Sequence, residues 1–449
     1  MAGAGDGRRE GSLEAPTRHP LAWREPAFYD AGALEAELER VFDICHGCRR
    51  CFSLCQSFPT LFDLIDATSD GELAGVDKRM YAQVVDNCYL CDMCYRTKCP
   101  YVPPHEWNVD FPHLMLRAKA VKARHQGTRL RDRVLAATDA VGSIAGIPVV
   151  AQLVNAVNGT RAGRVVLEKL LGVHRDAPVP GYQSRSAHQL LRRLPAPASA
   201  PVATPETTGR VAIFSTCYGN RNEPRLVTDL AAVFAHNGIT LSLVDREACC
   251  GMPKLELGDL EAVARLKERN LPQLLALVDA GHDIVAPVPS CVLMFKQELP
   301  LMFPDDAGVQ RLRERVFDPF EYLMLRHKAG LLRTDFKAPL GSVSYHVACH
   351  LRVQNIGLKT RDLLRLVPGT TVEAIERCSG HDGTYGVKKE FRAASMKIAA
   401  PVVQKVKAAA ADHYSSDCPM AGHQVESGLA PGSPAPEHPL ALLRQAYGL

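Results

Sequence analysis

The spacing of hydrophobic residues divides the chain into a helical front part and two later parts of mixed type. In residues 33–44, four large apolar residues recur at helical spacing, which predicts a helix that ends at Cys45. Residues 60–87 form a further helical and loop stretch. The front part, residues 33–125, is therefore expected to be mainly helical.

After residue 210, short apolar runs alternate with longer segments of helical period. The first half of this part predicts strands at 211–214, 239–244 and 283–286, and helices at 223–237 and 259–278. The second half repeats this order, with strands at 342–347, 371–375 and 413–416, and helices at 359–366 and 388–410. Two open α/β sheets are expected.

Two segments between these parts have their own character. Residues 134–157 are rich in Ala, Val, Leu and Ile and are flanked by arginines, but Asp139 and Pro148 interrupt them. They are expected either to pack as a pair of helices on the protein's own core or to lie at a membrane interface beside a quinone pool. They are too interrupted for a conventional transmembrane span. Residues 178–208, rich in Pro and Ala, predict a linker.

Composition and charge exclude several classes of protein. The 449 residues are 46% hydrophobic, enough for several cores and for about two to four domains. The 53 basic residues barely exceed the 49 acidic ones, and no basic stripe with interleaved aromatic residues occurs, so nucleic acid is not an expected partner. The first 20 residues are polar and lack an apolar secretion signal, so a reducing cytoplasmic location is expected.

Eight cysteines in the front part form two runs, Cys45-x2-Cys48-x2-Cys51-x3-Cys55 and Cys88-x2-Cys91-x2-Cys94-x4-Cys99. Thiolates are the soft ligands of iron–sulfur clusters, and C-x2-C turns let successive sulfurs converge. The runs therefore predict two 4Fe-4S clusters. In the two-cluster bacterial ferredoxin pattern, the fourth cysteine of each run serves the other cluster. That pattern assigns one cluster to Cys45, Cys48, Cys51 and Cys99, and the other to Cys88, Cys91, Cys94 and Cys55.

Zinc and disulfides are the alternatives for these eight cysteines. Structural zinc uses two C-x2-C pairs and leaves the third cysteine of each run without a role. A disulfide framework needs an oxidising compartment. The chain departs from the ferredoxin pattern at two places: the second run has four residues before its last cysteine, and Gln56 stands where a proline usually follows the first run. These departures affect the assignment of the fourth cysteines to the two clusters rather than the number of clusters.

Seven more cysteines lie just past predicted strand ends: Cys217, Cys249, Cys250 and Cys291 in the first repeat, and Cys349, Cys378 and Cys418 in the second. Equivalent cysteines are 132, 129 and 127 residues apart, and such near-constant offsets mark a duplicated domain. Ligands bind outside the carboxyl ends of strands in open α/β sheets, so each repeat is expected to direct its thiols at a metal site. Buried structural cysteine is the alternative.

These motifs resemble a known family, the C-terminal iron–sulfur protein of anaerobic glycerol-3-phosphate dehydrogenase and the fused B and C subunits of heterodisulfide reductase. The resemblance covers nearly the whole chain, as a ferredoxin region followed by two CCG domains. In that family a complete CCG domain has a cysteine, a Cys-Cys-Gly sequence and a final C-x2-C pair, and it can hold a noncubane iron–sulfur cluster.

This chain departs from the family pattern at three positions. Val288 replaces a cysteine of the final pair in the first domain, and Ser379 and Ala421 replace cysteines in the second. Four thiolates in the first domain are still expected to bind an iron–sulfur cluster or zinc. The three thiolates of the second need another ligand, for which the candidates are His350, His381 and His423. Hydrogen-bonded loop histidines are the alternative.

The expected fold is thus an α+β multidomain architecture, a helical two-cluster ferredoxin domain followed by two α/β CCG-domain repeats. Its expected segments are a flexible N-terminal arm (1–32), the ferredoxin domain (33–125), a helical connection and linker (126–210), the first CCG domain (211–335) and a second, degenerate one (336–449).

The resemblance implies two classes of function. In the first, the protein relays electrons from a flavoprotein dehydrogenase or other donor to a quinone or protein acceptor. In the second, it is a catalytic disulfide or thiol reductase of the heterodisulfide reductase type. The incomplete CCG motifs favour the relay.

Partners and location complete these expectations. Chains of this kind also resemble proteins that are associated with rubrerythrin-like diiron peroxidases. A diiron protein is therefore an alternative partner. Residues 3–7 are rich in glycine but lack the preceding strand of a nucleotide-binding fingerprint, so a partner is expected to supply the electrons. The protein is expected to be cytoplasmic. The alternative is peripheral attachment to the inner face of the cytoplasmic membrane.

Overall fold

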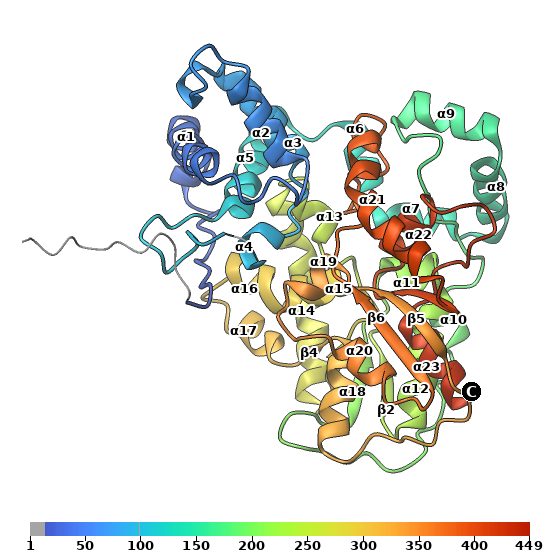
Figure 1. The fold of residues 1–449 in the computed structure, drawn as a ribbon. Coiled ribbons are helices and arrows are strands. Elements are labelled where there is room, and N and C mark those ends of the chain that lie inside the picture. The colour runs from blue at the N-terminus through green and yellow to red at the C-terminus, as the bar shows by residue number, and fades with distance from the viewer. Residues whose placement is uncertain (1–13, 98) are drawn as a thin grey trace, which may run out of the picture.

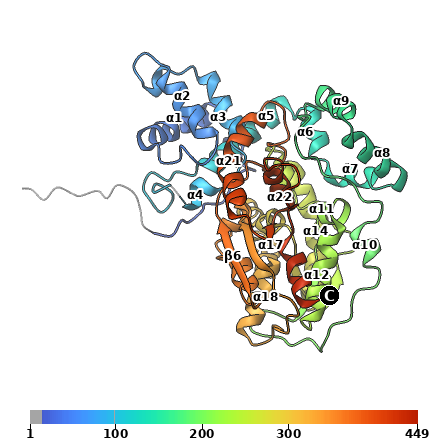
Figure 2. The same cartoon turned by 45° about the vertical axis from the view of Figure 1, so that its right-hand side comes forward.

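A computed structural model describes residues 14–97 and 99–449; the glycine-rich residues 3–7 lie outside this range. In Figure 1, the N-terminal helices and the helices α8 (Pro148–Gly159) and α9 (Arg161–Leu171) lie on opposite sides of the long helix α21 (Arg392–Ala409), with the strands of two small sheets below. Figure 2 again shows α8 and α9 on the side of α21 opposite the first helices of the chain. The N-terminal helices are α1 (Ala31–Cys48), α2 (Ser57–Asp66), α3 (Tyr81–Asn87), α4 (Met93–Thr97) and α5 (Phe111–Gln126). The short 3-10 helix η1 (Pro26–Tyr29) precedes α1, and the 3-10 helices η2 (Leu73–Gly75) and η3 (Lys78–Met80) lie between α2 and α3.

Helix α1 carries the first cysteines. It begins at Asp30, whose side chain accepts a hydrogen bond from the Ala33 amide at 2.6 Å, and it buries the apolar face that the sequence predicts. The expected end at Cys45 is wrong, because the helix continues to Cys48 and ends at Arg49 in a left-handed conformation (φ 50°). Since side chains three residues apart share a helix face, Cys45 and Cys48 lie on one side.

Residues 14–32 pack against the rest of the protein, although a flexible arm was expected for residues 1–32. Trp23 is buried and donates its indole N–H to the carbonyl of Met302 at 2.9 Å. Leu21 is also buried, and Arg18 forms ion pairs with Asp92 and Asp110. Apolar burial and charge pairing together fix this segment, which sequence periodicity does not reveal.

The first repeat forms a parallel sheet of order β2-β1-β3-β4, from β1 (Arg210–Ile213), β2 (Thr240–Leu243), β3 (Asp283–Val285) and β4 (Val316–Phe317). The first three strands confirm the predicted order, whereas β4 has only two residues and shows no period in the sequence. Its helices are α11 (Cys217–Arg221), α12 (Pro224–His236), α13 (Met252–Leu255), α14 (Leu260–Asp279), α15 (Pro289–Leu293), the π-helix η4 (Met294–Glu298), α16 (Leu299–Met302), α17 (Ala307–Arg313) and α18 (Pro319–Lys328).

The second repeat forms a parallel sheet of order β6-β5-β7, from β5 (Gly341–His346), β6 (Thr370–Ile375) and β7 (His413–Ser416). Its helices are α19 (Cys349–Arg352), α20 (Lys359–Leu364), α21 (Arg392–Ala409), α22 (Pro419–Glu426) and α23 (Pro439–Tyr447). Helix α23 crosses back to the first repeat, where Arg444 pairs with Asp229 of α12 at 2.7 Å and Tyr447 donates to the carbonyl of Arg333 at 2.7 Å. The two repeats therefore interlock.

Between the N-terminal region and the first repeat lie α6 (Leu130–Leu135), α7 (Thr138–Ala145), α8 (Pro148–Gly159), α9 (Arg161–Leu171) and the one-turn helix α10 (Ala187–Leu190). Helices α7–α9 leave large apolar side chains exposed, which we call the α7–α9 apolar surface: Ile144, Ile147, Val149, Leu153, Val157, Val166 and Leu170. In the described residues no single helix is long and apolar enough to cross a membrane; α7 and α8 meet that test only as a pair bent by 104°.

Candidate functional site

The eight N-terminal cysteines gather in two neighbouring groups. Burial raises the pKa of the Cys45 thiol, and the nearby thiols of Cys51, Cys99 and Cys48 raise it further. Burial also raises the pKa of Cys99 to about 11, with Cys48 among its neighbours. These four cysteines come from α1, from the loop after it and from the end of the second run, and so form one group.

The second group joins the remaining cysteine of the first run to the second run. Burial raises the pKa of the Cys94 thiol, and its interacting thiols are Cys51, Cys91, Cys88 and Cys55. Cys55 in turn interacts with Cys88. Because the Cys94 thiol also interacts electrostatically with Cys51 of the first group, the two groups adjoin.

The backbone around these thiols has features that suit iron–sulfur clusters. Three residues inside the cysteine runs, Arg49, Leu90 and Asp92, have left-handed φ angles of 50°, 55° and 59° without being glycine. Such strain persists where the surrounding structure needs it, often at functional sites. Backbone amides also donate toward the sulfurs, as Leu90 does to Cys88 and Met93 to Cys91. Amide donors to sulfur are one means by which proteins tune iron–sulfur clusters.

No group of three or more His, Cys, Asp or Glu side chains in residues 14–97 and 99–449 is placed to hold a single metal ion. A four-iron cluster makes a different demand, because each thiolate binds its own iron. The convergent thiols, of which Cys88 and Cys94 are buried and the others half-buried, fit that demand chemically together with their amide donors.

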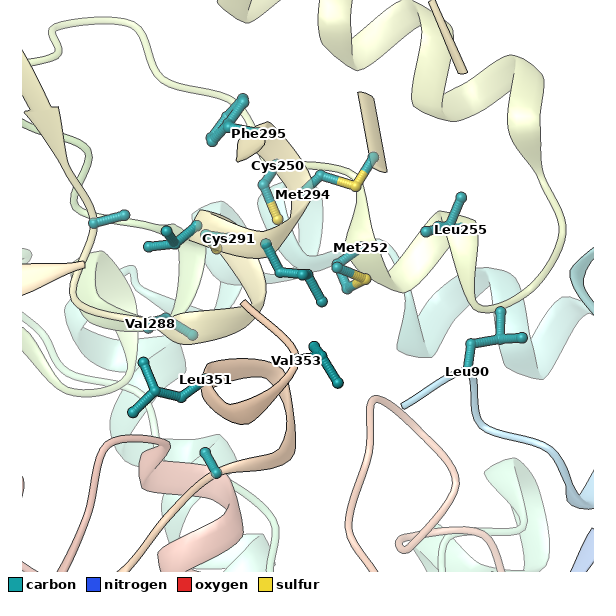
Figure 3. Packing of buried hydrophobic residues seen from close by; sticks show 14 of the residues in the cluster. Leu90, Cys250, Met252, Leu255, Val288, Cys291, Met294, Phe295, Leu351 and Val353 are labelled. Carbon is teal, nitrogen blue, oxygen red and sulfur yellow. The ribbon is translucent and has the colours of Figure 1, made fainter. Parts of the chain in front are cut away.

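The first repeat gathers its four cysteines beyond the ends of β1, β2 and β3. A hydrogen bond from Cys217, followed by one from Cys250, lowers the pKa of Cys249 well below its usual value. Cys250 also interacts with Cys291. Figure 3 shows Cys250 and Cys291 among Met252, Met294 and other buried apolar side chains. These thiols thus form one set, in which Cys217 is half-buried and the other three are buried.

Helix α7 supports this set. Asp139 accepts a hydrogen bond from the backbone amide of Cys249 at 2.8 Å, and the Thr138 hydroxyl interacts with Cys217. The sequence shows Asp139 only as a break in an apolar segment, so its role at the thiol loop was missed.

In the second repeat, Cys349 and Cys378 lie together, while Cys418 stands beside acidic groups. A hydrogen bond from Cys349 outweighs burial and lowers the pKa of Cys378 to about 6. The Gly380 amide donates to the Cys378 sulfur at 3.3 Å. Burial raises the pKa of Cys418 to about 12, with Asp382 and Asp417 as its charged neighbours. The second repeat therefore presents a close thiol pair and a third, separate thiol.

One cavity of about 660 Å³ brings both repeats together, since all seven of their cysteines line it. Its apolar wall comes from α6–α9 and includes Val134, Val141, Val154 and Leu167. Its polar wall includes His350, His381, Asp382 and Glu256. A volume of this size suits a small organic molecule.

The three candidate histidines of the second repeat differ. His423 is held between Glu223 at 3.0 Å and Glu426 at 2.8 Å, which raises its pKa to about 9, so it is already paired. Both ring nitrogens of His381, and Nε2 of His350, are buried without a hydrogen-bond partner. Burial lowers the pKa of His381 to about 4, so its ring is neutral near pH 7. Nε2 of His350 lies 3.7 Å from the carboxylate of Asp382, so His381 is the more available of the two.

Two carboxyl groups on the cavity wall were not predicted from the sequence. Burial and the neighbouring Asp382 raise the pKa of Glu256 to about 8. Burial likewise raises the pKa of Asp382, which has a left-handed φ of 119°. Glu256 thus holds a proton at neutral pH beside the thiols.

Comparison with known proteins agrees with the duplicated architecture. The sequence profile of a family described as a cysteine-rich (CCG) domain matches residues 211–296 and again residues 343–426, which confirms the duplication. Over 330 residues, 72% of this chain, it is 28% identical to the C subunit of anaerobic glycerol-3-phosphate dehydrogenase from Escherichia coli K12, covering 80% of that protein. Over 186 residues, 40% of this chain, it is 30% identical to lactate utilization protein A of Bacillus cereus, covering 75% of that protein.

Proposed function

This chain belongs to the family of CCG-domain iron–sulfur proteins represented by the C subunit of anaerobic glycerol-3-phosphate dehydrogenase, and on that premise we propose that it relays electrons. The observation that carries the proposal is the sequence of adjoining thiol groups. It runs from the N-terminal pair of groups to Cys349 and Cys378, and on to the cavity that both repeats line.

We propose two 4Fe-4S clusters in the N-terminal region, with the ligands divided as the thiol groups are. One would be held by Cys45, Cys48, Cys51 and Cys99, and the other by Cys88, Cys91, Cys94 and Cys55. When bound, such clusters carry single electrons. The residues of the chain partly shield the thiols from solvent, direct amide donors at the sulfurs and set the two groups side by side.

The metal content of the repeats is part of the same proposal. Cys217, Cys249, Cys250 and Cys291 would hold an iron–sulfur cluster or zinc. The close pair Cys349 and Cys378, with Cys418, would need a further ligand. His381 is suited to this role because both of its ring nitrogens are unpartnered, and His350 is the alternative.

The cavity supports a quinone as the electron acceptor. Its wall of valine and leucine side chains suits an apolar ring or chain. The neutral imidazole of His381 can donate a hydrogen bond to a carbonyl oxygen, and Glu256 can supply a proton when the acceptor is reduced. The second candidate function is reduction of a disulfide in the cavity. It is favoured by the cavity thiols and by the protonated carboxyl group of Glu256.

The α7–α9 apolar surface supports peripheral attachment to the inner face of the cytoplasmic membrane. Its helices have their exposed apolar side chains on one side and line the cavity on the other. Residues 129–171 contain six basic and three acidic residues, which suits an anionic lipid surface. An apolar acceptor dissolved in the bilayer would then lie close to the cavity.

The proposed donor is a flavoprotein dehydrogenase, and a diiron protein is the alternative partner. Reduction of the purified protein with dithionite, followed by mixing with a short-chain quinone in an anaerobic stopped-flow instrument, tests the relay. The visible absorption should bleach and then recover at a rate that rises with quinone concentration. A reduced protein that quinone leaves bleached would count against the proposed acceptor, and a protein with no bleachable absorption would count against the relay.

A further inference from the structure

A tyrosine inside the second cysteine run connects the N-terminal region to the second repeat. Tyr89 lies between Cys88 and Cys91 and is 5% exposed. Its hydroxyl lies 3.2 Å from the sulfur of Cys378, a residue 289 positions later in the chain. A side chain in one ligand turn thus contacts a sulfur of another site.

A second tyrosine makes the contact reciprocal. Tyr385 of the second repeat packs against Tyr89 with ring centroids 5.0 Å apart, and its hydroxyl donates to the side chain of Asn87 at 3.0 Å. Tyr385 also stacks on Phe391, with centroids 4.6 Å apart. Each region therefore reaches into the other, and the Tyr89 ring is packed against Tyr385.

We propose that Tyr89 couples the two redox regions, as a positioning residue whose hydrogen bond to Cys378 raises the reduction potential of the centre that this thiolate binds. The inference rests on the proposed electron-relay function. A metal-bound thiolate has no proton, whereas a phenol ordinarily keeps its proton at neutral pH, so the Tyr89 hydroxyl is the donor. Hydrogen bonds to ligand sulfurs stabilise the more negative, reduced state.

The transfer itself is simple in chemical terms. With iron–sulfur centres bound, the N-terminal cysteines would hold the group that gives up one electron, and Cys378 would be a ligand of the group that accepts it. No covalent bond forms or breaks, and the Tyr89 hydroxyl keeps its proton. By this inference the second repeat, despite its lost cysteines, receives electrons directly from the N-terminal region, because Cys91 interacts with Cys378 and Cys349.

The matched test compares two hydroxyl deletions in the full-length protein purified without oxygen. Tyr89→Phe removes the donor to Cys378 but keeps the ring, whereas Tyr385→Phe removes from the same contact a hydroxyl that donates to the side chain of Asn87. Redox titration followed by electron paramagnetic resonance should show one midpoint potential shifted to a lower value in Tyr89→Phe. Every potential should stay at the wild-type value in Tyr385→Phe, and iron content should be retained in both.

Four results separate this inference from the proposed function. Wild-type potentials in Tyr89→Phe, with full iron content, would overturn the role of Tyr89 and leave the relay intact. Equal shifts in both variants would also overturn it, because they would report general loosening of the contact. A Cys378→Ser variant with unchanged metal content and spectra would show that Cys378 binds no metal centre. A wild-type protein without reducible iron would overturn the relay itself.

Discussion

Replacing Arg18 with methionine is expected to destabilise the protein by about 3–5 kcal/mol, because it leaves buried carboxylates without their cation. Arg18 donates to Asp110 at 2.8 Å, also bonds Asp92, and lies 3.7 Å from Glu298. Burial alone would raise the pKa of Asp110, but the charges of Arg18 and His113 hold it at about 2, below the ordinary 3.8. A shift of about two units corresponds to about 2–3 kcal/mol for Asp110 alone.

The pH dependence gives this prediction a second test. Because the folded pKa of Asp110 is depressed, its stabilising contribution is present above about pH 4 and is lost as the pH falls through about 2. Urea unfolding should therefore show a difference between wild type and Arg18→Met that shrinks over this range. Arg79→Met, which removes an exposed pair with Asp77, is the control and should change stability little.

Two results would refute the reasoning about Arg18. One is a loss of stability no greater than that of the Arg79→Met control. The other is a difference between variant and wild type that persists unchanged at low pH. Because Asp92 lies between Cys91 and Cys94, the variant should also retain less iron, which iron analysis of the purified protein measures.

Three further predictions concern other parts of the structure. Cys91→Ser should remove roughly four irons, seen by iron analysis; an unchanged content would make the ligand assignment wrong. Gly380→Ala should lower the thermal unfolding temperature, because the glycine has a φ of +67° and a Cβ would lie 2.1 Å from the Ser395 carbonyl oxygen; an unchanged temperature would contradict this. Replacing the exposed Val149 and Leu153 with lysine should release membrane-bound protein in sedimentation, with iron content retained, whereas loss of iron would assign these residues to the core.

Much of the fold could be predicted because its determinants are local. The strands β1, β2, β3, β5, β6 and β7 follow from short apolar runs, and the spacing of the repeat cysteines shows the duplication. Strand β4 could not be predicted, because two residues carry no period. The position of α23 on α12 depends on pairs such as Arg444 and Asp229, which are 215 residues apart.

The sequence predicts the cysteines of the candidate site but not the residues that surround them. Cysteine spacing identifies the residues, whereas the single cavity shared by both repeats depends on how the two sheets face each other. Tyr89 and Glu256 carry no sequence signal, because an ordinary tyrosine or glutamate acquires its role only from distant neighbours. In the sequence, Asp139 only interrupts an apolar segment. In the structure, its carboxylate accepts a hydrogen bond from the backbone amide of Cys249.

The most direct test of the central claim is the iron and sulfide content of the full-length protein purified without oxygen, together with its paramagnetic resonance spectrum after reduction by dithionite. The account predicts a brown protein with roughly eight irons in the N-terminal region, further metal in the repeats, and signals from reduced 4Fe-4S clusters that interact magnetically. A colourless protein that contains only zinc, with no signal after reduction, would contradict it.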